Sequence, residues 1–294
     1  MKNSKTVFQE LVASIHLKDD PEEIKSIAHI LLETVSGITR TDVVAGKFVS
    51  LSPETTQSLQ RYVDRINKGE PVQYVVGEET FFGRKFHVNP SVLIPRPETE
   101  ELIRVVLDYR YAASTAEKSG PRLKILDIGT GSGCIPITLY LELGDVEVYG
   151  TDISPAALSV AVDNAENLHA KVTFIEHDVL AEKIPVTGLD VIVSNPPYVA
   201  ETEKSEMSLN VLGYEPHQAL FVSDDNPLIF YNAIVRQSRE SLKSNGLLAV
   251  EINQRFGHEV SGLFIEAGFR EIEIIKDLAG KDRVVKGLNT GLPL

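Results

Sequence analysis

The chain has 294 residues, of which 43% are hydrophobic and 24% charged, and its net charge is −13. These values are typical of a soluble globular protein of one or two domains, and the one cysteine, Cys134, excludes an intramolecular disulfide and a cysteine-rich metal site. Residues 1–90 hold 11 Lys and Arg against 12 Asp and Glu, whereas residues 91–294 hold 18 against 30. So acidic a segment is a poor match to a nucleic-acid backbone and favours a protein or small-molecule substrate.

The sequence predicts neither a secretory signal nor a membrane span. Its first 20 residues lack an apolar core, and no apolar run approaches the roughly 18 residues that a bilayer requires. We therefore expect a cytoplasmic protein. The seven histidines form no metal-binding pattern, so no metal is predicted.

Residues 1–70 are predicted to form a small helical bundle. Asp20-Pro21 and Ser52-Pro53 are each typical of a helix start, because a capping side chain precedes a proline and acidic residues. The bundle either holds a macromolecular substrate or only stabilises the chain. Apolar residues recur at helical spacing at Ile24, Ile27, Leu31, Leu32 and Val35, and again at Leu59, Tyr62, Val63 and Ile66.

Residues 71–95 are predicted to be a β-hairpin linker. Residues 74–76 lead into a stretch over residues 80–88 that is typical of two strands, with a turn near Gly83-Arg84. A further helix then begins within residues 95–100, with a proline in its first turn and acids behind it. Residues 96–100 are either only a helix start with a salt bridge or the border of a cofactor pocket.

Residues 96–294 alternate strands and helices, which predicts an α/β domain with a Rossmann-like, doubly wound and largely parallel sheet. One long helix, over residues 226–243, is expected to be capped by Asn226. The remaining predicted helices are 134–143 and 155–168, the strands are 124–128, 146–151, 172–176, 189–194 and 246–252, and a closing antiparallel pair is 272–276 with 283–286.

A glycine-rich turn follows the first strand of this domain, with the sequence Asp127-Ile128-Gly129-Thr130-Gly131-Ser132-Gly133. Ligands of open α/β sheets bind at this place, against bare backbone. A dinucleotide motif would need glycine at position 134, which is Cys134. Asp127 at the strand end could reach a cationic amino group, which S-adenosyl-L-methionine has and NAD lacks. We therefore predict an S-adenosyl-L-methionine site.

Two more acids follow the next two strands. Asp152 lies 19 residues after Gly133 and can accept hydrogen bonds from both ribose hydroxyls, while Asp178 is placed to meet the adenine amino group. Plainer interpretations stay open: Asp127 caps a helix, Asp152 caps the helix that starts at Pro155, and Asp178 is an ordinary loop acid.

The most informative motif, Asn195-Pro196-Pro197-Tyr198, follows the fourth strand. It resembles the signature of methyltransferases that act on planar amide-like or aromatic-amine nitrogens, which are poor nucleophiles. The Asn195 side-chain oxygen and the Pro196 carbonyl can accept the N–H bonds of such a nitrogen and orient it toward a methyl sulfonium. Pro196 and Pro197 fix the backbone, and Tyr198 offers a face for stacking. The plain alternative is a proline-rich turn.

Further motifs closely resemble the peptide chain release factor glutamine methyltransferase family. The resemblance covers about residues 20–290. The motifs are Pro71-Val72-Gln73-Tyr74, Phe81-Phe82-Gly83, Val88-Asn89-Pro90, residues 93–100, residues 127–133, residues 195–198, Tyr214-Glu215-Pro216 with Ala219-Leu220, and Gly280 with Arg283-Val284-Val285.

The resemblance implies a class I methyltransferase sheet and N5-methylation of the glutamine in the Gly-Gly-Gln loop of class 1 release factors. S-adenosyl-L-methionine would be the donor and S-adenosyl-L-homocysteine the product. Asn195 and Pro196 would hold the glutamine amide, with Pro197 and Tyr198 beside the substrate, and the helical domain would grip the release factor. Val179 joins the expected cofactor residues, although it and Cys134 vary between members.

Two alternatives to this function stay open. An N6-adenine methyltransferase acting on DNA or RNA would require a basic groove beside Tyr198. A non-catalytic binding module would have a damaged glycine turn. The segment Glu215-Pro216-His217 has no clear chemical role, and we expect His217 to be a loop histidine rather than a base.

Overall fold

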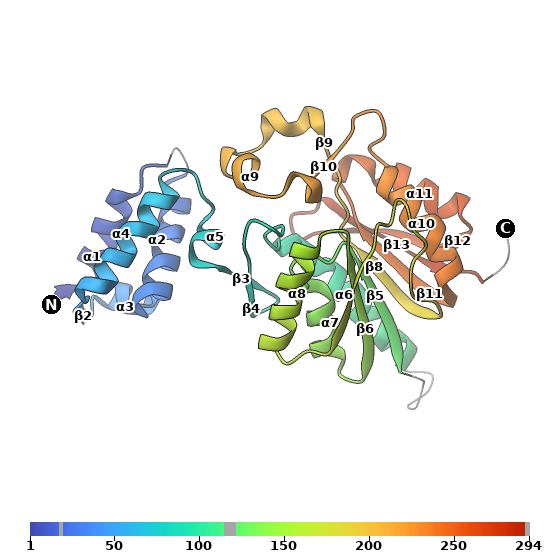
Figure 1. The fold of residues 1–294 in the computed structure, drawn as a ribbon, viewed down its shortest axis with the longest axis horizontal. Coiled ribbons are helices and arrows are strands. Elements are labelled where there is room, and N and C mark those ends of the chain that lie inside the picture. The colour runs from blue at the N-terminus through green and yellow to red at the C-terminus, as the bar shows by residue number, and fades with distance from the viewer. Residues whose placement is uncertain (18–19, 115–121, 292–294) are drawn as a thin grey trace. The chain divides into compact units, whose positions relative to one another are not determined.

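The computed structural model describes residues 1–17, 20–114 and 122–291 (Figure 1). The chain divides into two compact units. The first comprises residues 1–78 together with residues 207–214, and the second comprises residues 79–206 together with the chain from residue 215 onward. Among the described helices, none is long and apolar enough to cross a membrane.

The first unit is the predicted helical bundle. Asp20 and Ser52 cap its two long helices as expected, accepting hydrogen bonds from the backbone N–H groups of Glu22 and Thr55. Its core is apolar, with Ala28, Leu31 and Leu32 fully buried. Its elements are β1 (Lys2–Asn3), α1 (Ser4–Ser14), α2 (Pro21–Ser36), α3 (Arg40–Ala45), β2 (Phe48–Val49), α4 (Pro53–Ile66), α5 (Val72–Val76) and α9 (Leu209–Tyr214).

The chain returns to this unit at α9, which no sequence pattern indicated. The Tyr214 hydroxyl donates a hydrogen bond to the Lys68 carbonyl at 3.2 Å, and the Tyr214 ring packs beside Gly69. The segment that follows the Asn195–Tyr198 motif is therefore anchored on the helical unit before the chain re-enters the second unit.

The predicted hairpin is present, but it begins later than expected. The strands β3 (Glu78–Phe81) and β4 (Arg84–His87) pair around a turn at Phe82-Gly83. Residues 74–76, which were expected to lead into the hairpin, instead belong to α5. That helix is brief because Pro71 begins it and Gly77, at φ 80°, ends it in the left-handed conformation that favours glycine.

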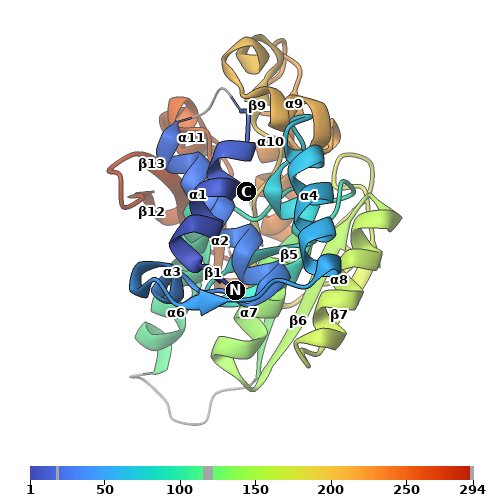
Figure 2. The same ribbon diagram turned by 90° about the vertical axis from the view of Figure 1, so that its left-hand side faces the viewer.

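The second unit is built on a seven-stranded sheet with the order β12-β13-β11-β8-β5-β6-β7. Strands β11, β8, β5, β6 and β7 are parallel neighbours, and β13 is antiparallel to both β11 and β12, so the predicted sheet and its closing pair are confirmed. Figure 2 shows β6 and β7 succeeding β5 toward one edge. The strands are β5 (Leu123–Ile128), β6 (Val146–Asp152), β7 (Val172–Glu176), β8 (Leu189–Ser194), β11 (Leu242–Glu251), β12 (Phe269–Lys276) and β13 (Asp282–Asn289).

Helices cover both faces of this sheet, because its central strands are apolar on both sides. Ile125 and Val191 point to a core shared with α6 (Glu100–Ser114) and α7 (Cys134–Leu143). Their neighbours Leu126 and Ile192 point to a second core, shared with α10 (Ile229–Ser241) and α11 (Gly257–Glu266). Figure 1 shows these layers, with α8 (Pro155–Asn167) beside α7.

The predicted helix over residues 226–243 was placed too wide at both ends. Asn226 is not its cap: the Ile229 N–H donates to the Asn226 carbonyl at 3.3 Å in a turn, and Leu228 precedes the helix without a side-chain cap. At the other end, Leu242 already pairs with Leu189 in the sheet. Tertiary pairing therefore ends the helix before its local sequence would.

The close packing beneath the glycine-rich turn over residues 129–133 can be tested at Gly150 of β6. A Cβ atom there would lie 2.9 Å from both the Phe174 ring and the Thr130 hydroxyl. Gly150→Ala is therefore expected to lower the free energy of unfolding by about 1–3 kcal/mol through overpacking. Gly262→Ala in α11 is the matched control, because no atom lies within 4 Å of its added Cβ, and better helix propensity should stabilise it by about 1 kcal/mol. Urea unfolding measures both; a neutral Gly150→Ala would contradict this packing.

Candidate functional site

The parallel strands end at the same edge of the sheet, and the segments that follow them surround a cavity of about 240 Å³. This is the position at which open α/β sheets bind ligands. Ser91, Val92 and Leu93 contribute to the cavity from the linker, and Pro216 and Ala219 from the segment after α9. Eight of the predicted site residues line it: Gly129, Gly131, Asp152, Asp178, Val179, Asn195, Pro196 and Pro197.

The other five predicted residues do not line this cavity. Gly133 serves packing, since a Cβ atom there would lie 2.9 Å from Ile137 and 3.1 Å from Ala161. Asp127, Thr130 and Ser132 are buried behind the turn, and Tyr198 directs its hydroxyl away from the cavity toward Glu251.

The glycine turn presents bare backbone to the cavity. Gly129, Gly131 and Gly133 have φ values of 76°, 53° and 78°, which L side chains rarely adopt. A Cβ atom at Gly131 would meet no protein atom within 4 Å. Glycine is therefore needed there for its backbone conformation, and the space beside it is open to a ligand.

Asp152 is held rigidly at the end of β6. Its Oδ2 accepts from the Gly131 N–H and its Oδ1 from the Ser154 N–H, each at 2.9 Å. Burial raises the pKa of Asp152, and these backbone N–H groups oppose that shift. The cap of α8 is Ser154, which accepts from the Ala157 N–H, so Asp152 is not that cap. Asp178 accepts from the Leu180 N–H at 2.8 Å, a loop interaction that leaves its carboxylate at the cavity.

The Asn195 amide has a defined orientation. Its Nδ2 donates to the Thr99 hydroxyl at 3.2 Å, which leaves Oδ1 as an acceptor at the cavity. Thr99 lies in the short 3-10 helix η1 (Pro97–Thr99), directly before α6. The strand end beneath is fixed by a bond from the Ser194 hydroxyl to the Ile128 carbonyl at 2.7 Å.

The segment over residues 96–100 begins a helix and carries a salt bridge, and none of its residues lines the cavity. Arg96 donates to the Oε1 atom of Glu215 at 2.5 Å, and the Ile94 N–H donates to Oε2 at 3.2 Å. The Glu215 side chain is only 1% exposed. Glu215 thus connects residues 94–96 to the segment that contributes Pro216 to the cavity. This is a structural role for the Glu215-Pro216-His217 segment, for which the sequence indicated none. His217 begins the short 3-10 helix η3 (His217–Ala219) rather than lying in a loop, and its ring meets that of Phe221 in β10 (Phe221–Val222) edge-on.

Sequence reasoning missed two buried residues at the site. Glu251, the last residue of β11, is 1% exposed and accepts from the Tyr198 hydroxyl at 3.0 Å. Burial and the Glu251 charge raise the pKa of Tyr198 well above its usual range. His177 lines the cavity, and neither ring nitrogen has a partner in the described part of the chain. A lone acid ending the apolar run Leu-Leu-Ala-Val was the available signal for Glu251.

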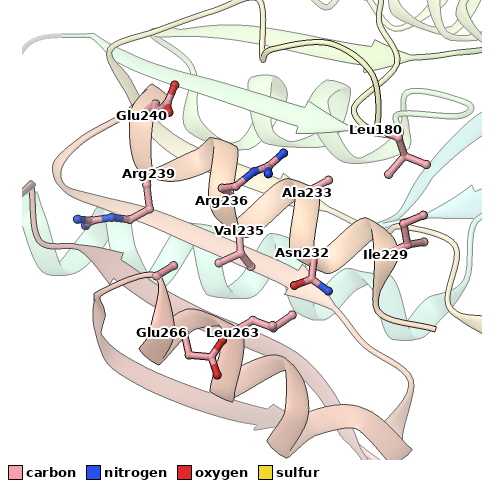
Figure 3. Close-up of a pocket in the computed structure, with 11 residues that line it drawn as sticks. Leu180, Ile229, Asn232, Ala233, Val235, Arg236, Arg239, Glu240, Leu263 and Glu266 are labelled. Carbon is pink, nitrogen blue, oxygen red and sulfur yellow. The ribbon is translucent and has the colours of Figure 1, made fainter. Parts of the chain in front are cut away.

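A larger hollow, of about 670 Å³, lies between α10 and α11 and is lined by Leu180, Asn232, Arg236 and Leu263, among others (Figure 3). It contains none of the predicted site residues. Within the described ranges, no group of three or more His, Cys, Asp or Glu side chains could hold a metal ion.

Comparison with solved structures supports the fold. The hMettl16 catalytic domain in complex with MAT2A 3'UTR hairpin 1 superposes with a TM-score of 0.55 at 15% identity, over 85% of both chains. The T. thermophilus 16S rRNA N2 G1207 methyltransferase (RsmC), solved with AdoMet and guanosine, gives a TM-score of 0.50 at 19% identity, over 72% of this chain and 49% of that one. At these identities the likeness is one of fold alone.

Sequence comparison is more specific. The PrmC N-terminal domain matches residues 12–77, and the methyltransferase small domain matches residues 113–220. The release factor glutamine methyltransferase of Bacteroides thetaiotaomicron is 43% identical, over 90% of this chain and 92% of that relative. Those of Flavobacterium psychrophilum and Bacillus subtilis are 40% and 38% identical, each over 97% of this chain and 98% of the relative. The chain therefore belongs to the release factor glutamine methyltransferase family.

Proposed function

We propose that the protein transfers the methyl group of S-adenosyl-L-methionine to the side-chain amide nitrogen, N5, of the glutamine in the Gly-Gly-Gln motif of class 1 peptide chain release factors. The observation that carries this proposal is the Asn195 amide, whose donor side is bonded to Thr99 and whose acceptor side is at the cavity. A planar amide N–H requires such an acceptor, and the names of the relatives indicate the amide.

The cavity suits a cationic nucleoside ligand better than a dinucleotide. Asp152 and Asp178 line it, and no Lys or Arg is among the described residues around it. A pyrophosphate would therefore face carboxylates without a compensating cation. Asp152, fixed by two backbone N–H groups, retains lone pairs for the ribose hydroxyls. Asp178 and Val179 are placed for the adenine, and the open space at Gly131 admits the ligand against the backbone.

Asp127 adds a buried carboxyl behind the glycine turn. It is fully buried, and neither oxygen has a hydrogen-bond partner among the described residues. Burial raises the pKa of Asp127 to about 7, the Thr130 hydroxyl opposes the shift and the Asp152 carboxylate adds to it. A nearby cationic amino group would favour the ionised form. We assign this role to the ammonium of S-adenosyl-L-methionine.

The chain's own contribution to the reaction is positioning. The bound cofactor supplies an electrophilic methyl group on a sulfonium. The Asn195 Oδ1 and the Pro196 carbonyl accept the two amide N–H bonds of the substrate and direct its nitrogen at that methyl group. The Pro196-Pro197 pair holds these acceptors in place, and Tyr198, anchored on Glu251, remains the proposed stacking surface. The proton leaves after methyl transfer, so no strong base is required.

The helical unit is proposed to hold the body of the release factor. The PrmC N-terminal domain matches residues 12–77, which make up most of that unit. Val44 and Phe48 expose 73% and 66% of their surface there, and exposed apolar side chains are typical of protein-binding surfaces. The acidic balance after residue 90 suits a basic partner surface.

The substrate class is tested by methyl transfer from labelled S-adenosyl-L-methionine. Intact release factor, the same factor with its loop glutamine replaced, and undermodified DNA and RNA are offered separately. We expect label on the intact factor alone. Label on nucleic acid would instead support the N6-adenine alternative and overturn the proposed substrate, while leaving the fold unchanged.

Two substitutions should separate chemistry from cofactor binding. Asn195→Ala removes the acceptor for the substrate amide, so kcat should fall by at least about 100-fold, while the cofactor Kd should change little. Asp152→Ala removes the ribose acceptor and should raise the cofactor Kd by about tenfold or more. Calorimetry and single-turnover assays measure the two effects. An equal loss of cofactor binding in Asn195→Ala would remove its assigned role.

The buried Asp127 predicts a pH-dependent stability of the ligand-free protein. Its pKa is about 7 when folded, against an ordinary value of 3.8. The folded protein disfavours the charged form of this group. Its contribution to the free energy of unfolding is therefore complete below about pH 4 and declines as pH rises toward 7. Relative to Asp127→Asn, which cannot titrate, the wild-type protein should lose about 3–4 kcal/mol across this interval. A parallel pH dependence for the two proteins would contradict the raised pKa.

A further inference from the structure

Two hydrogen bonds support the Asn195–Tyr198 motif from the side opposite the cavity. At one end, the Asn195 Nδ2 donates to the Thr99 hydroxyl at 3.2 Å. At the other end, the Tyr198 hydroxyl donates to Glu251 Oε1 at 3.0 Å. Thr99 is 3% exposed and Glu251 is 1% exposed, so water does not compete for either bond. Neither residue lines the cavity.

Glu251 lies where the two bonds converge. In the parallel pair of β11 and β8, Val250 is in register with Ser194, which places Glu251 beside Asn195. Burial raises the pKa of Glu251, and the hydroxyls of Thr99 and Tyr198 oppose this shift, followed by Arg283. The Tyr198 hydroxyl bonds to this carboxyl directly, and the strand register brings the carboxyl beside Asn195 and its bond to Thr99. Its Oε2 has no hydrogen-bond partner in the described residues, and Arg283 is itself bonded to Asp277 at 3.0 Å.

The ionised form of this carboxyl fixes the direction of the hydrogen bonds that meet it. A carboxylate only accepts, and a hydroxyl has one hydrogen to donate. When Thr99 gives its hydrogen to Glu251, its oxygen can only accept from Asn195. The Asn195 amide must then turn its NH₂ group toward Thr99 and its oxygen toward the cavity.

This constraint matters because the two ends of an asparagine amide are nearly equal in shape. Packing alone does not decide which end faces the cavity. If Nδ2 faced the cavity, its N–H groups would meet the N–H groups of the substrate nitrogen. That nitrogen would then lack the acceptor that orients it. Only the hydrogen bonds behind Asn195 distinguish a productive site from one of opposite polarity.

We propose that Thr99 and Glu251 are positioning residues that set the polarity of the Asn195 amide, so that Oδ1 rather than Nδ2 meets the nitrogen to be methylated. The inference rests on the proposed function, since it assumes an N–H-bearing nitrogen at Asn195. It assigns roles to the threonine that ends η1 and to the acid that ends β11.

Thr99 offers the cleanest test. Thr99→Val keeps the shape and removes the hydroxyl, whereas Thr99→Ser keeps the hydroxyl. At saturating cofactor and release factor, kcat should fall about tenfold in Thr99→Val and stay within about twofold in Thr99→Ser. The cofactor Kd should stay within about twofold in both. Thr138→Val is the control, because Thr138 is equally buried and its hydroxyl bonds to no described residue.

Glu251→Gln provides a second, independent test at about pH 8.5, well above the ordinary range of carboxyl pKa values. The glutamine keeps the shape and gains a donor, so both orientations of Asn195 become possible and kcat should fall about tenfold. The Thr99→Val/Glu251→Gln double variant should be no slower than the slower single variant, because both changes remove the same constraint.

The outcomes separate this inference from the function on which it rests. A wild-type enzyme that does not label the release factor would overturn the proposed function and this inference with it. An active wild type with an unchanged kcat in Thr99→Val would overturn the inference alone. So would an equal loss in Thr99→Ser, or losses that multiply in the double variant. If Glu251→Gln fails to fold, the Thr99 comparison decides.

Discussion

The strands β5, β6, β8 and β11 run parallel to one another, and this alignment positions every part of the site. Each strand ends at the same edge, so segments far apart in sequence meet around one cavity. The register is tight: Ile128 lies beside Ser194, and Ser194 lies beside Val250. The glycine-rich turn, the Asn195 motif and Glu251 therefore begin within a residue of one another along the sheet. A shift of one register position would send these side chains to different faces.

Two carboxyl groups at the site are buried without a full set of hydrogen-bond partners among the described residues. Asp127 and Glu251 are both essentially inaccessible to solvent, and each has at least one oxygen without a hydrogen bond among the described residues. Burying an unpartnered carboxyl is unfavourable, and burial raises the pKa of both groups. Such departures from good packing are expected where function requires them. Under the proposed function, Asp127 would meet a cationic ligand, while Glu251 accepts the hydrogen bond of the Tyr198 hydroxyl.

Much of this arrangement is predictable from local sequence, because strands, helices and the glycine turn depend on near neighbours. The helix over residues 134–143 and the strand over residues 189–194 have the predicted bounds. What escaped prediction depends on distant partners. Leu242 joins a strand because Leu189 lies beside it, and α9 returns to the helical unit because Tyr214 packs at Lys68. The cap expected at Asn226 is absent for a different reason: the Asn226 carbonyl accepts the Ile229 N–H in a turn that precedes the helix.

The same distinction applies within the site. Asn195 is recognisable because its neighbours in sequence form a motif, whereas Thr99 and Glu251 reach it from 96 and 56 positions away. Residues 93–99 connect these parts: Leu93 lines the cavity, Arg96 bonds to Glu215, and Thr99 bonds to Asn195. Residues 93–99 lie within the second unit, so a segment outside the sheet contributes both to the cavity and to the bond that orients Asn195. Under the proposed function, the sheet alone would therefore not orient the central amide of the site, because its partner Thr99 comes from outside the sheet.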